Sequence, residues 1–107
     1  SNNIELSESI TRLGLLRTRA NAEGFVISVR KRNGVRLDGK PWTMLNLYIW
    51  DGDNVVEIVA FGSSINSQLE SIKKGQKIGL IGAEIGWRAG LPQLRIDSRN
   101  TRITINP

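Results

Sequence analysis

Residues 42–61, WTMLNLYIWDGDNVVEIVAF, decide the fold, because two alternating runs flank a turn in this stretch. Apolar side chains at every second position are typical of a β-strand with one buried face. The sequence DGDN at 51–54, between the two runs, is a turn signal. The stretch therefore predicts a β-hairpin with strands at 42–51 and 55–61. The side chains expected to face the core are Leu45, Leu47, Ile49, Val56, Ile58 and Ala60, and those expected to face outward are Met44, Asn46, Tyr48, Trp50, Glu57, Val59 and Phe61.

The segment before this hairpin predicts another strand and a basic loop. Residues 22–31, AEGFVISVRK, are rich in β-branched side chains and predict a first strand in which Gly24 marks a bend or bulge. A polar, basic loop is expected from there to about Pro41. We expect residues 22–107 to form one domain and residues 1–21 to be an N-terminal extension that packs on the domain or leads into it.

A short helix is predicted after the hairpin, because the spacing of apolar residues changes there. Ile65, Leu69 and Ile72 recur at helical spacing, serines stand at the start, and Gly75 follows the end. This pattern predicts one amphipathic helix over residues 63–74.

Two further strands complete the pattern. They are predicted at 77–85 and 93–105, with a loop at 86–92 between them and with Leu94 and Ile96 pointing inward. Three strands, a helix and two strands is the layout of the OB-fold, whereas an SH3-like barrel would lack the helix. We therefore expect an all-β protein, a five-stranded OB-fold barrel with one short helix between strands 3 and 4.

The positive charge is concentrated in two segments. The 107 residues carry a net charge of +5; residues 30–42 hold five basic residues against Asp38, and residues 86–102 hold four arginines against Asp97. Clustered basic residues are the electrostatic footprint of a protein that binds a polyanion. A solvated loop with ordinary surface arginines would give the same pattern, so charge alone leaves both interpretations open.

Cysteine and histidine are both absent from the sequence. Their absence removes disulfides, thiolate and imidazole metal ligands, and the nucleophile–base pairs that depend on them. The ten acidic residues are scattered, and none belongs to a recognisable catalytic motif. We expect the protein not to be an enzyme and to need no metal and no cofactor.

Four short motifs in a fixed order carry a family resemblance. They are DGKPW at 38–42, LYIWDGDNVVEIVAFG at 47–62, IKKGQ at 72–76 and PQLRI at 92–96. With them the chain resembles the DNA-binding OB domains of the replication protein A family, including its archaeal relatives. The resemblance implies binding of single-stranded DNA with little sequence specificity, in DNA replication, repair or recombination. It also implies an intracellular protein, in an archaeal cytoplasm or a eukaryotic nucleus, whose partners are other OB-fold modules or subunits of a replication protein A-like complex and not a membrane.

The candidate binding residues divide into aromatic and basic side chains. The resemblance implies that Phe61, at the end of the third strand, and Trp87, between strands four and five, stack on bases. Single-strand binders in general combine such π-faces with cations that follow the phosphates. For Trp42 and Trp50, packing in the core remains an equal alternative. The full set of expected nucleic-acid-binding residues is Arg32, Arg36, Lys40, Trp42, Tyr48, Phe61, Trp87, Arg88 and Arg95.

Glu57 departs from the family pattern, because relatives often carry a basic or neutral residue on this outward face. A carboxylate there opposes phosphate. Either an arginine from a neighbouring strand neutralises it, or it forms a hydrogen bond with the edge of a base.

Two other ligands fit the same residues. OB-folds also bind RNA, and DNA is favoured by the resemblance alone. Alternatively the hairpin docks an acidic peptide, with the basic residues as its counter-charge. No trimerisation helix is recognisable after the fifth strand, so we expect the isolated domain to be monomeric.

Overall fold

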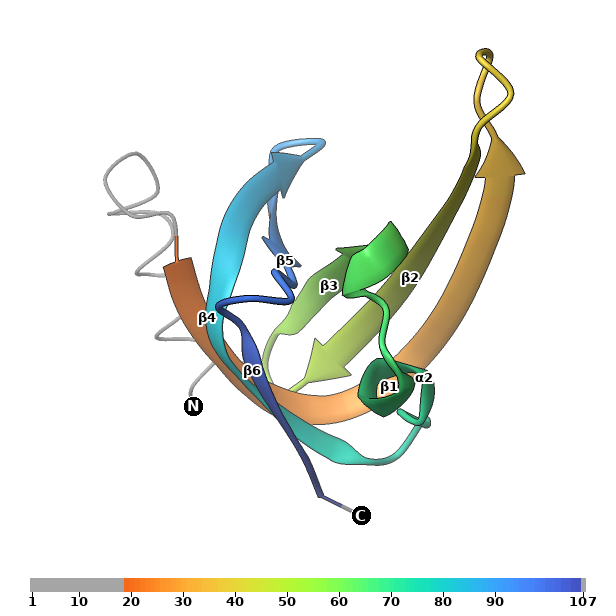
Figure 1. The fold of residues 1–107 in the computed structure, drawn as a ribbon. Helices are drawn as coiled ribbons and strands as arrows, with labels where there is room; N and C mark the ends of the chain where they lie inside the picture. The colour runs from red at the N-terminus through yellow and green to blue at the C-terminus, as the bar shows by residue number, and fades with distance from the viewer. Residues whose placement is uncertain (1–18, 107) are drawn as a thin grey trace.

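Six strands form one sheet that closes into a barrel (Figure 1). The computed structural model describes residues 19–106. The order along the sheet is β1-β2-β3-β5-β4-β6, and β1 also pairs with β4, which closes a ring of five strands. Only the pairing of β3 with β5 is parallel among these strands. The strands are β1 (Arg19–Val35), β2 (Pro41–Trp50), β3 (Val55–Phe61), β4 (Lys77–Arg88), β5 (Leu91–Arg95) and β6 (Arg102–Asn106).

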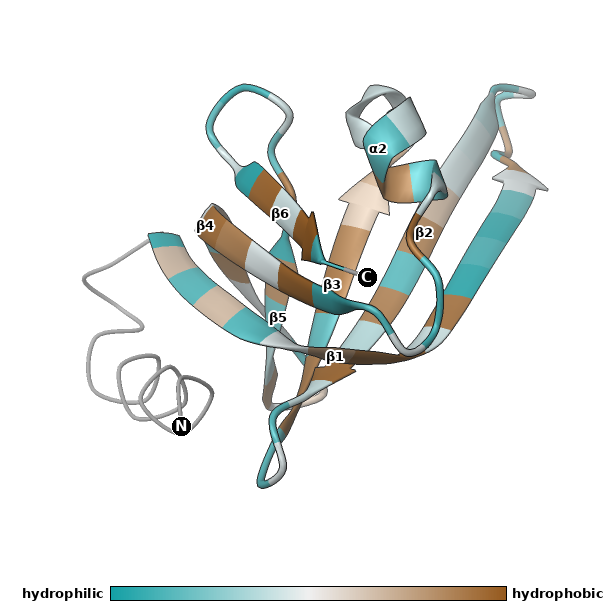
Figure 2. Cartoon of the chain, turned by 90° about the horizontal axis from the view of Figure 1, so that it is seen from below, coloured by the Kyte–Doolittle hydropathy of each residue, from teal (hydrophilic) through white to brown (hydrophobic). Residues whose placement is uncertain are grey.

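Alternate side chains of the strands fill the barrel, as the sequence predicted. Leu47, Ile49 and Ile58 are at most 1% exposed, and full burial of one such side chain stabilises the fold by roughly 1.5–3 kcal/mol. The apolar and polar bands that alternate along the strands in Figure 2 follow from this pattern. The inward positions that are confirmed by burial are Leu45, Leu47, Ile49, Val56, Ile58, Ala60, Leu94 and Ile96.

The first hairpin is longer than predicted, and its loop is shorter. β1 runs from Arg19 to Val35 instead of over residues 22–31, and it stays paired with β2 as far as the pair Val35 and Pro41. The expected loop is thus reduced to residues 36–40 at the tip of an arm that projects from the barrel (Figure 1). The prediction was wrong because basic side chains indicate only that a segment is exposed to solvent. An exposed strand and an exposed loop both meet this condition, so the charge could not distinguish them.

The N-terminal extension predicted for residues 1–21 lies mostly outside the described residues, and its last three residues belong to β1. Gly24 is not the bulge, because the register shifts are at Val26/Ser28 and at Ala20/Ala22. A Cβ at Gly24 would lie 2.9 Å from the carbonyl oxygen of Trp50. Glycine is therefore needed there for close approach of two backbones.

The helix is much shorter than the predicted 63–74. A 3₁₀ turn, η1 (Gly62–Ser64), is followed by the single-turn helix α2 (Ser67–Glu70). The two are separated because Ile65 is extended and the Asn66 side chain accepts a hydrogen bond from the Leu69 N–H, which starts a new helix. Leu69 is buried in the core, so the apolar spacing correctly predicted which side chain packs there. The helix that it predicted was too long.

The predicted fifth strand, 93–105, is two strands. β5 and β6 both pair antiparallel with β4, and residues 96–101 form a loop between them. The Asp97 side chain holds this loop by accepting hydrogen bonds from the Arg99 N–H and the Asn100 amide. The loop lies against Gly82, where a Cβ would be 2.8 Å from the Asn100 oxygen.

β4 continues to Arg88, so the loop predicted at 86–92 is a tight hairpin. Its two turn residues, Ala89 and Gly90, have φ values of 51° and 77°, the sign that a type I′ turn requires. Trp87 therefore lies on a strand and not in a loop. Within residues 19–106, the structure contains no helix with the length and apolarity needed to cross a membrane.

Candidate functional site

The outer face of the barrel carries three rows of side chains that lie opposite one another across neighbouring strands. Residues that pair across strands point to the same side of a sheet. The first row is Arg32, Met44 and Phe61; the second is Arg30, Asn46, Val59, Arg95 and Glu84; the third is Ser28, Tyr48, Glu57, Gln93 and Gly86. We call this surface the outer face. It combines three arginines with two aromatic rings, Phe61 and Tyr48, and two carboxylates, Glu57 and Glu84.

Phe61 lies at the end of β3, where the chain turns into η1. Its side chain is 42% exposed, and the Arg95 guanidinium lies over its ring at 5.1 Å from the centroid. A cation at this distance is attracted by the π-face of the ring. An aromatic side chain left half-exposed beside a cation is suited to stack on a planar ligand.

The middle of the outer face has a buried floor. Val59 and Asn46, which are paired across β3 and β2, are 0% and 3% exposed although neither belongs to the core cluster. The sequence predicted that both face outward, and their register confirms it. Their burial was not predicted, because alternation along a strand gives the side of the sheet and not the depth of a side chain.

Four side chains donate hydrogen bonds to the Glu57 carboxylate. Its Oε2 accepts from Asn46 Nδ2 at 2.9 Å, Tyr48 Oη at 3.0 Å and Arg88 Nη1 at 2.8 Å, and its Oε1 accepts from Gln93 Nε2 at 2.9 Å. The Glu57 side chain is 11% exposed. A carboxylate can be buried to this extent because charged and neutral donors replace its water. Of the two roles left open for Glu57, neutralisation by an arginine from another strand is present.

The network also holds the hydroxyl of Tyr48. The hydrogen bond to Glu57 raises the pKa of Tyr48, and burial adds to the effect. Tyr48 is therefore a neutral donor at physiological pH. Its side chain is tied to Glu57, so it is less free to stack than Phe61.

Comparison with solved structures identifies the architecture. An OB domain from Thermoplasma acidophilum matches with a TM-score of 0.59 and 20% identity, covering 80% of this chain and 73% of that one. The chain has an OB-fold. A replication factor A related protein from Methanobacterium thermoautotrophicum matches at TM-score 0.60 and 18% identity, over 84% of each chain. The second OB-fold domain of replication protein A from Methanococcus maripaludis matches with a TM-score of 0.55 and 16% identity, covering 79% of this chain and 82% of that one. No protein-family model and no curated protein sequence matches the chain.

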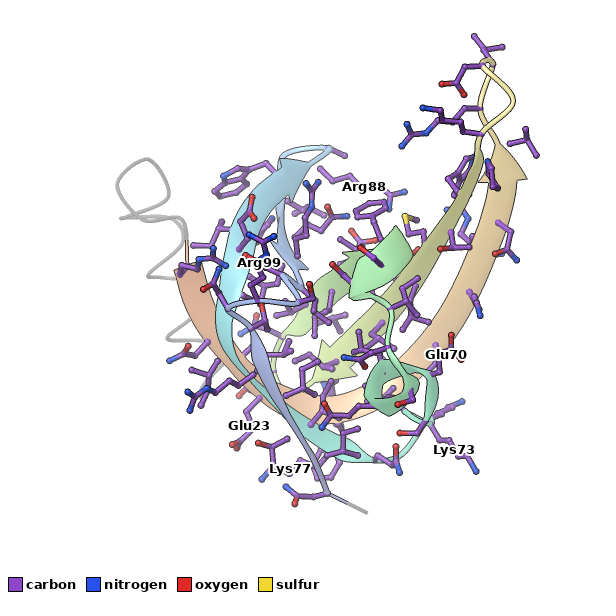
Figure 3. The ribbon with its side chains drawn as sticks, in the orientation of Figure 1. Glu23, Glu70, Lys73, Lys77, Arg88 and Arg99 are labelled. Carbon is purple, nitrogen blue, oxygen red and sulfur yellow. The ribbon has the colours of Figure 1, made fainter. Side chains whose placement is uncertain are left out.

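The predicted basic residues occupy two parts of this OB-fold. Arg32 and Arg95 lie on the outer face, and Arg88 reaches Glu57 from the far side of β5. In Figure 3, Arg88 lies between the β4–β5 hairpin and the β1–β2 arm. Arg36 and Lys40 are exposed at the tip of that arm, where the Arg36 N–H donates to the Lys40 carbonyl oxygen. The arm therefore extends the positive surface beyond the barrel.

Three of the four predicted aromatic residues, Trp42, Tyr48 and Phe61, are on the same side of the sheet as the outer face, and Trp87 is not. Trp42 is on the same side of β2 as Met44, and a Cβ at Gly34 would lie 2.4 Å from its indole ring, so the ring packs on the opposite strand of the arm. Trp87 is 50% exposed. It is adjacent to Gly86 and Arg88 on β4, so strand alternation puts it on the opposite side of the β4–β5 hairpin.

Sequence reasoning missed Arg30, Asn46 and Gln93 as site residues. The alternation of β2 put Asn46 beside Tyr48, which was a usable signal for a polar cluster. Gln93 could not be assigned, because the parallel pairing of β5 with β3 is a long-range contact that no local pattern encodes.

Proposed function

We propose that this domain binds single-stranded DNA along its outer face, with little dependence on base sequence. The observation that carries the proposal is the exposed Phe61 ring beneath the Arg95 guanidinium, with Arg32 in the same row. A π-face accepts any base, and each stack contributes about 1–3 kcal/mol to affinity. A binding role, and not catalysis, is what this surface supports.

The arginines around Phe61 supply the phosphate contacts in this proposal. Arg30 and Arg32 lie on the same face of β1, and Arg36 and Lys40 are further along the arm, at its tip. Arg88 is 55% exposed and uses one nitrogen for Glu57, which leaves other N–H donors for a phosphate. A strand bound along these residues would have cations beside its backbone and Phe61 beside its bases.

The choice of DNA rests on the resemblance to the replication protein A family and on the names of two similar structures. One of those structures is the second OB-fold domain of replication protein A, and the other is a replication factor A related protein. A role in DNA replication, repair or recombination, beside other OB-fold modules, is the corresponding proposal for this chain.

A fluorescence titration with an oligothymidine tests the proposal. Trp42 is next to the arm's basic residues and reports binding, and we expect saturable quenching that a duplex of the same length does not produce. An oligoglutamate peptide is the competitor for the alternative ligand. Displacement of the oligonucleotide's signal by equal amounts of the peptide, or no saturable signal with the oligothymidine, would overturn the proposal. A parallel titration with oligouridine measures the preference for DNA over RNA.

A further inference from the structure

The Glu57 network fixes the direction of the amide groups around it. An ionised carboxylate only accepts hydrogen bonds, so Gln93 must turn its Nε2 toward Glu57. The Gln93 side-chain oxygen is then directed away from Glu57, and no described residue donates a hydrogen bond to it. Tyr48 is constrained in the same way, because its hydrogen points to Glu57 and only oxygen lone pairs remain. The Gln93 oxygen and the Tyr48 lone pairs are therefore acceptors on the outer face, beside the remaining N–H donors of Arg88.

Asn46 gives an independent indication that the network serves a ligand. Its side-chain nitrogen donates to Glu57, but its oxygen is buried and has no hydrogen-bond partner among the described residues. An unsatisfied buried carbonyl is unfavourable, and an apolar side chain at this position would avoid it. The amide is thus kept at some expense of stability to orient the Glu57 carboxylate. Such pre-orientation is typical of a binding site.

Gly86 leaves open space beside Gln93. The two residues are paired at the end of the third row, and a Cβ at Gly86 would meet only the Gln93 backbone oxygen, at 3.7 Å, within a radius of 4 Å. A residue without a side chain in the middle of a strand allows close approach of a ligand to the backbone. A flat group can therefore lie over Gly86 with its edge toward the Gln93 amide.

From this juxtaposition of Gln93, Glu57 and Gly86, we infer that the third row reads the edge of one nucleotide base and prefers a base with an exocyclic amino group. The inference rests on the proposed function and adds a preference at one position of an otherwise unspecific strand. The amino group of cytosine donates to the Gln93 oxygen. Uracil has a carbonyl oxygen at the same place, so two acceptors would face each other.

The test compares two oligothymidines of about 12 nucleotides, a length within the usual footprint of OB-folds. One has a single central cytosine and the other a single central uracil, which have nearly the same size. We expect the wild-type protein to bind the cytosine oligomer about 3- to 10-fold more tightly, the range of one net hydrogen bond. A ratio of one, or a preference for uracil, would overturn the inference.

Three variants assign the preference to the row. Gln93→Leu removes the acceptor, Glu57→Gln removes the carboxylate that orients it, and Gly86→Val fills the space with a side chain that strands accommodate. Each should bring the ratio to about one when measured below its melting temperature. A full cytosine preference in Gln93→Leu and Gly86→Val would show that the row does not read the base.

Gln68→Leu is the matched control. Gln68 is an exposed glutamine of α2 that bonds the Ile103 carbonyl oxygen, away from the outer face, and its loss should leave the ratio unchanged. A ratio lost in this variant as well would count against the row as its source. The two proposals fail differently: no binding of any oligonucleotide rejects the proposed function, whereas binding of oligothymidine without a cytosine preference rejects only this inference.

Discussion

The guanidinium carbon of Arg95 lies 5.1 Å from the centre of the Phe61 ring. The two residues come from β5 and β3, which run parallel, and Arg95 pairs with Val59, two residues before Phe61. The cation restrains the ring, and 42% of the Phe61 side chain remains exposed. The pair is therefore a pre-formed aromatic surface with a positive charge beside it.

Phe61→Ala should weaken binding of oligothymidine by about 1–3 kcal/mol, the contribution of one base stack. The melting temperature should change little, because the ring is not part of the core cluster. Fluorescence titration and thermal unfolding measure the two effects.

Phe25→Ala is the control for this variant, since Phe25 is 48% exposed and lies under Lys77 at 6.0 Å, outside the three rows. It repeats the chemistry of the Phe61 pair elsewhere on the barrel. Equal losses of affinity in the two variants would contradict a specific role of Phe61.

Trp87→Ala should reduce affinity only for long oligonucleotides. Trp87 lies on the opposite side of the β4–β5 hairpin from Arg88, so a strand must pass around the hairpin to stack on it. We expect a loss of about 1–3 kcal/mol with an oligothymidine of about 16 nucleotides and almost none with one of about 6. A large drop in melting temperature would instead show that the buried half of the Trp87 side chain makes a packing contact that stabilises the fold.

Binding should weaken as salt rises, because phosphate contacts release condensed counterions. Three to five contacts predict a log–log slope of about −2 to −3.5, and Arg36→Ala should reduce its magnitude by about 0.7. Lys31→Ala is the control on the same arm and should leave the slope nearly unchanged. Lys31 is on the other face of β1 and forms an exposed ion pair with Glu70 of α2, which is labelled in Figure 3. A slope near zero would indicate that the arm makes no phosphate contacts.

The strand content and the core of the barrel could be predicted because both depend on local alternation. Leu47 and Ile58 are buried at the positions that a period of two requires. The positions where the strands end were predicted less accurately. β1 continues through Arg32 because its partner β2 is there to pair with it, and the single predicted fifth strand divides because the loop at Asp97 packs on Gly82.

The candidate site was predictable only in part, for a related reason. Arg32 and Arg95 were identified by residue type and Phe61 through the family resemblance, and the register brings the three to neighbouring positions of the outer face. Glu57 was recognised as unusual, but its four donors come from three other strands. Such a network depends on the barrel closing, so local sequence patterns do not contain it.

The loop between β5 and β6 should open in acid. Hydrogen bonds from the Asn100 amide, from the Arg99 N–H and from Arg19 lower the pKa of Asp97 from 3.8 to about 2. Because the folded pKa is below the unfolded value, the unfolded chain takes up the proton more readily, and the stabilisation present above pH 3.8 is lost as the pH falls toward 2.

The Asp97→Asn variant lacks the charge at every pH, so it should melt at a lower temperature than the wild type near neutral pH. The difference in melting temperature should then shrink below pH 3.8 and nearly vanish at about pH 2, because all other carboxylates titrate alike in the two proteins. A difference that stays constant over this interval would mean that the Asp97 carboxylate is not held in its charged form by the loop.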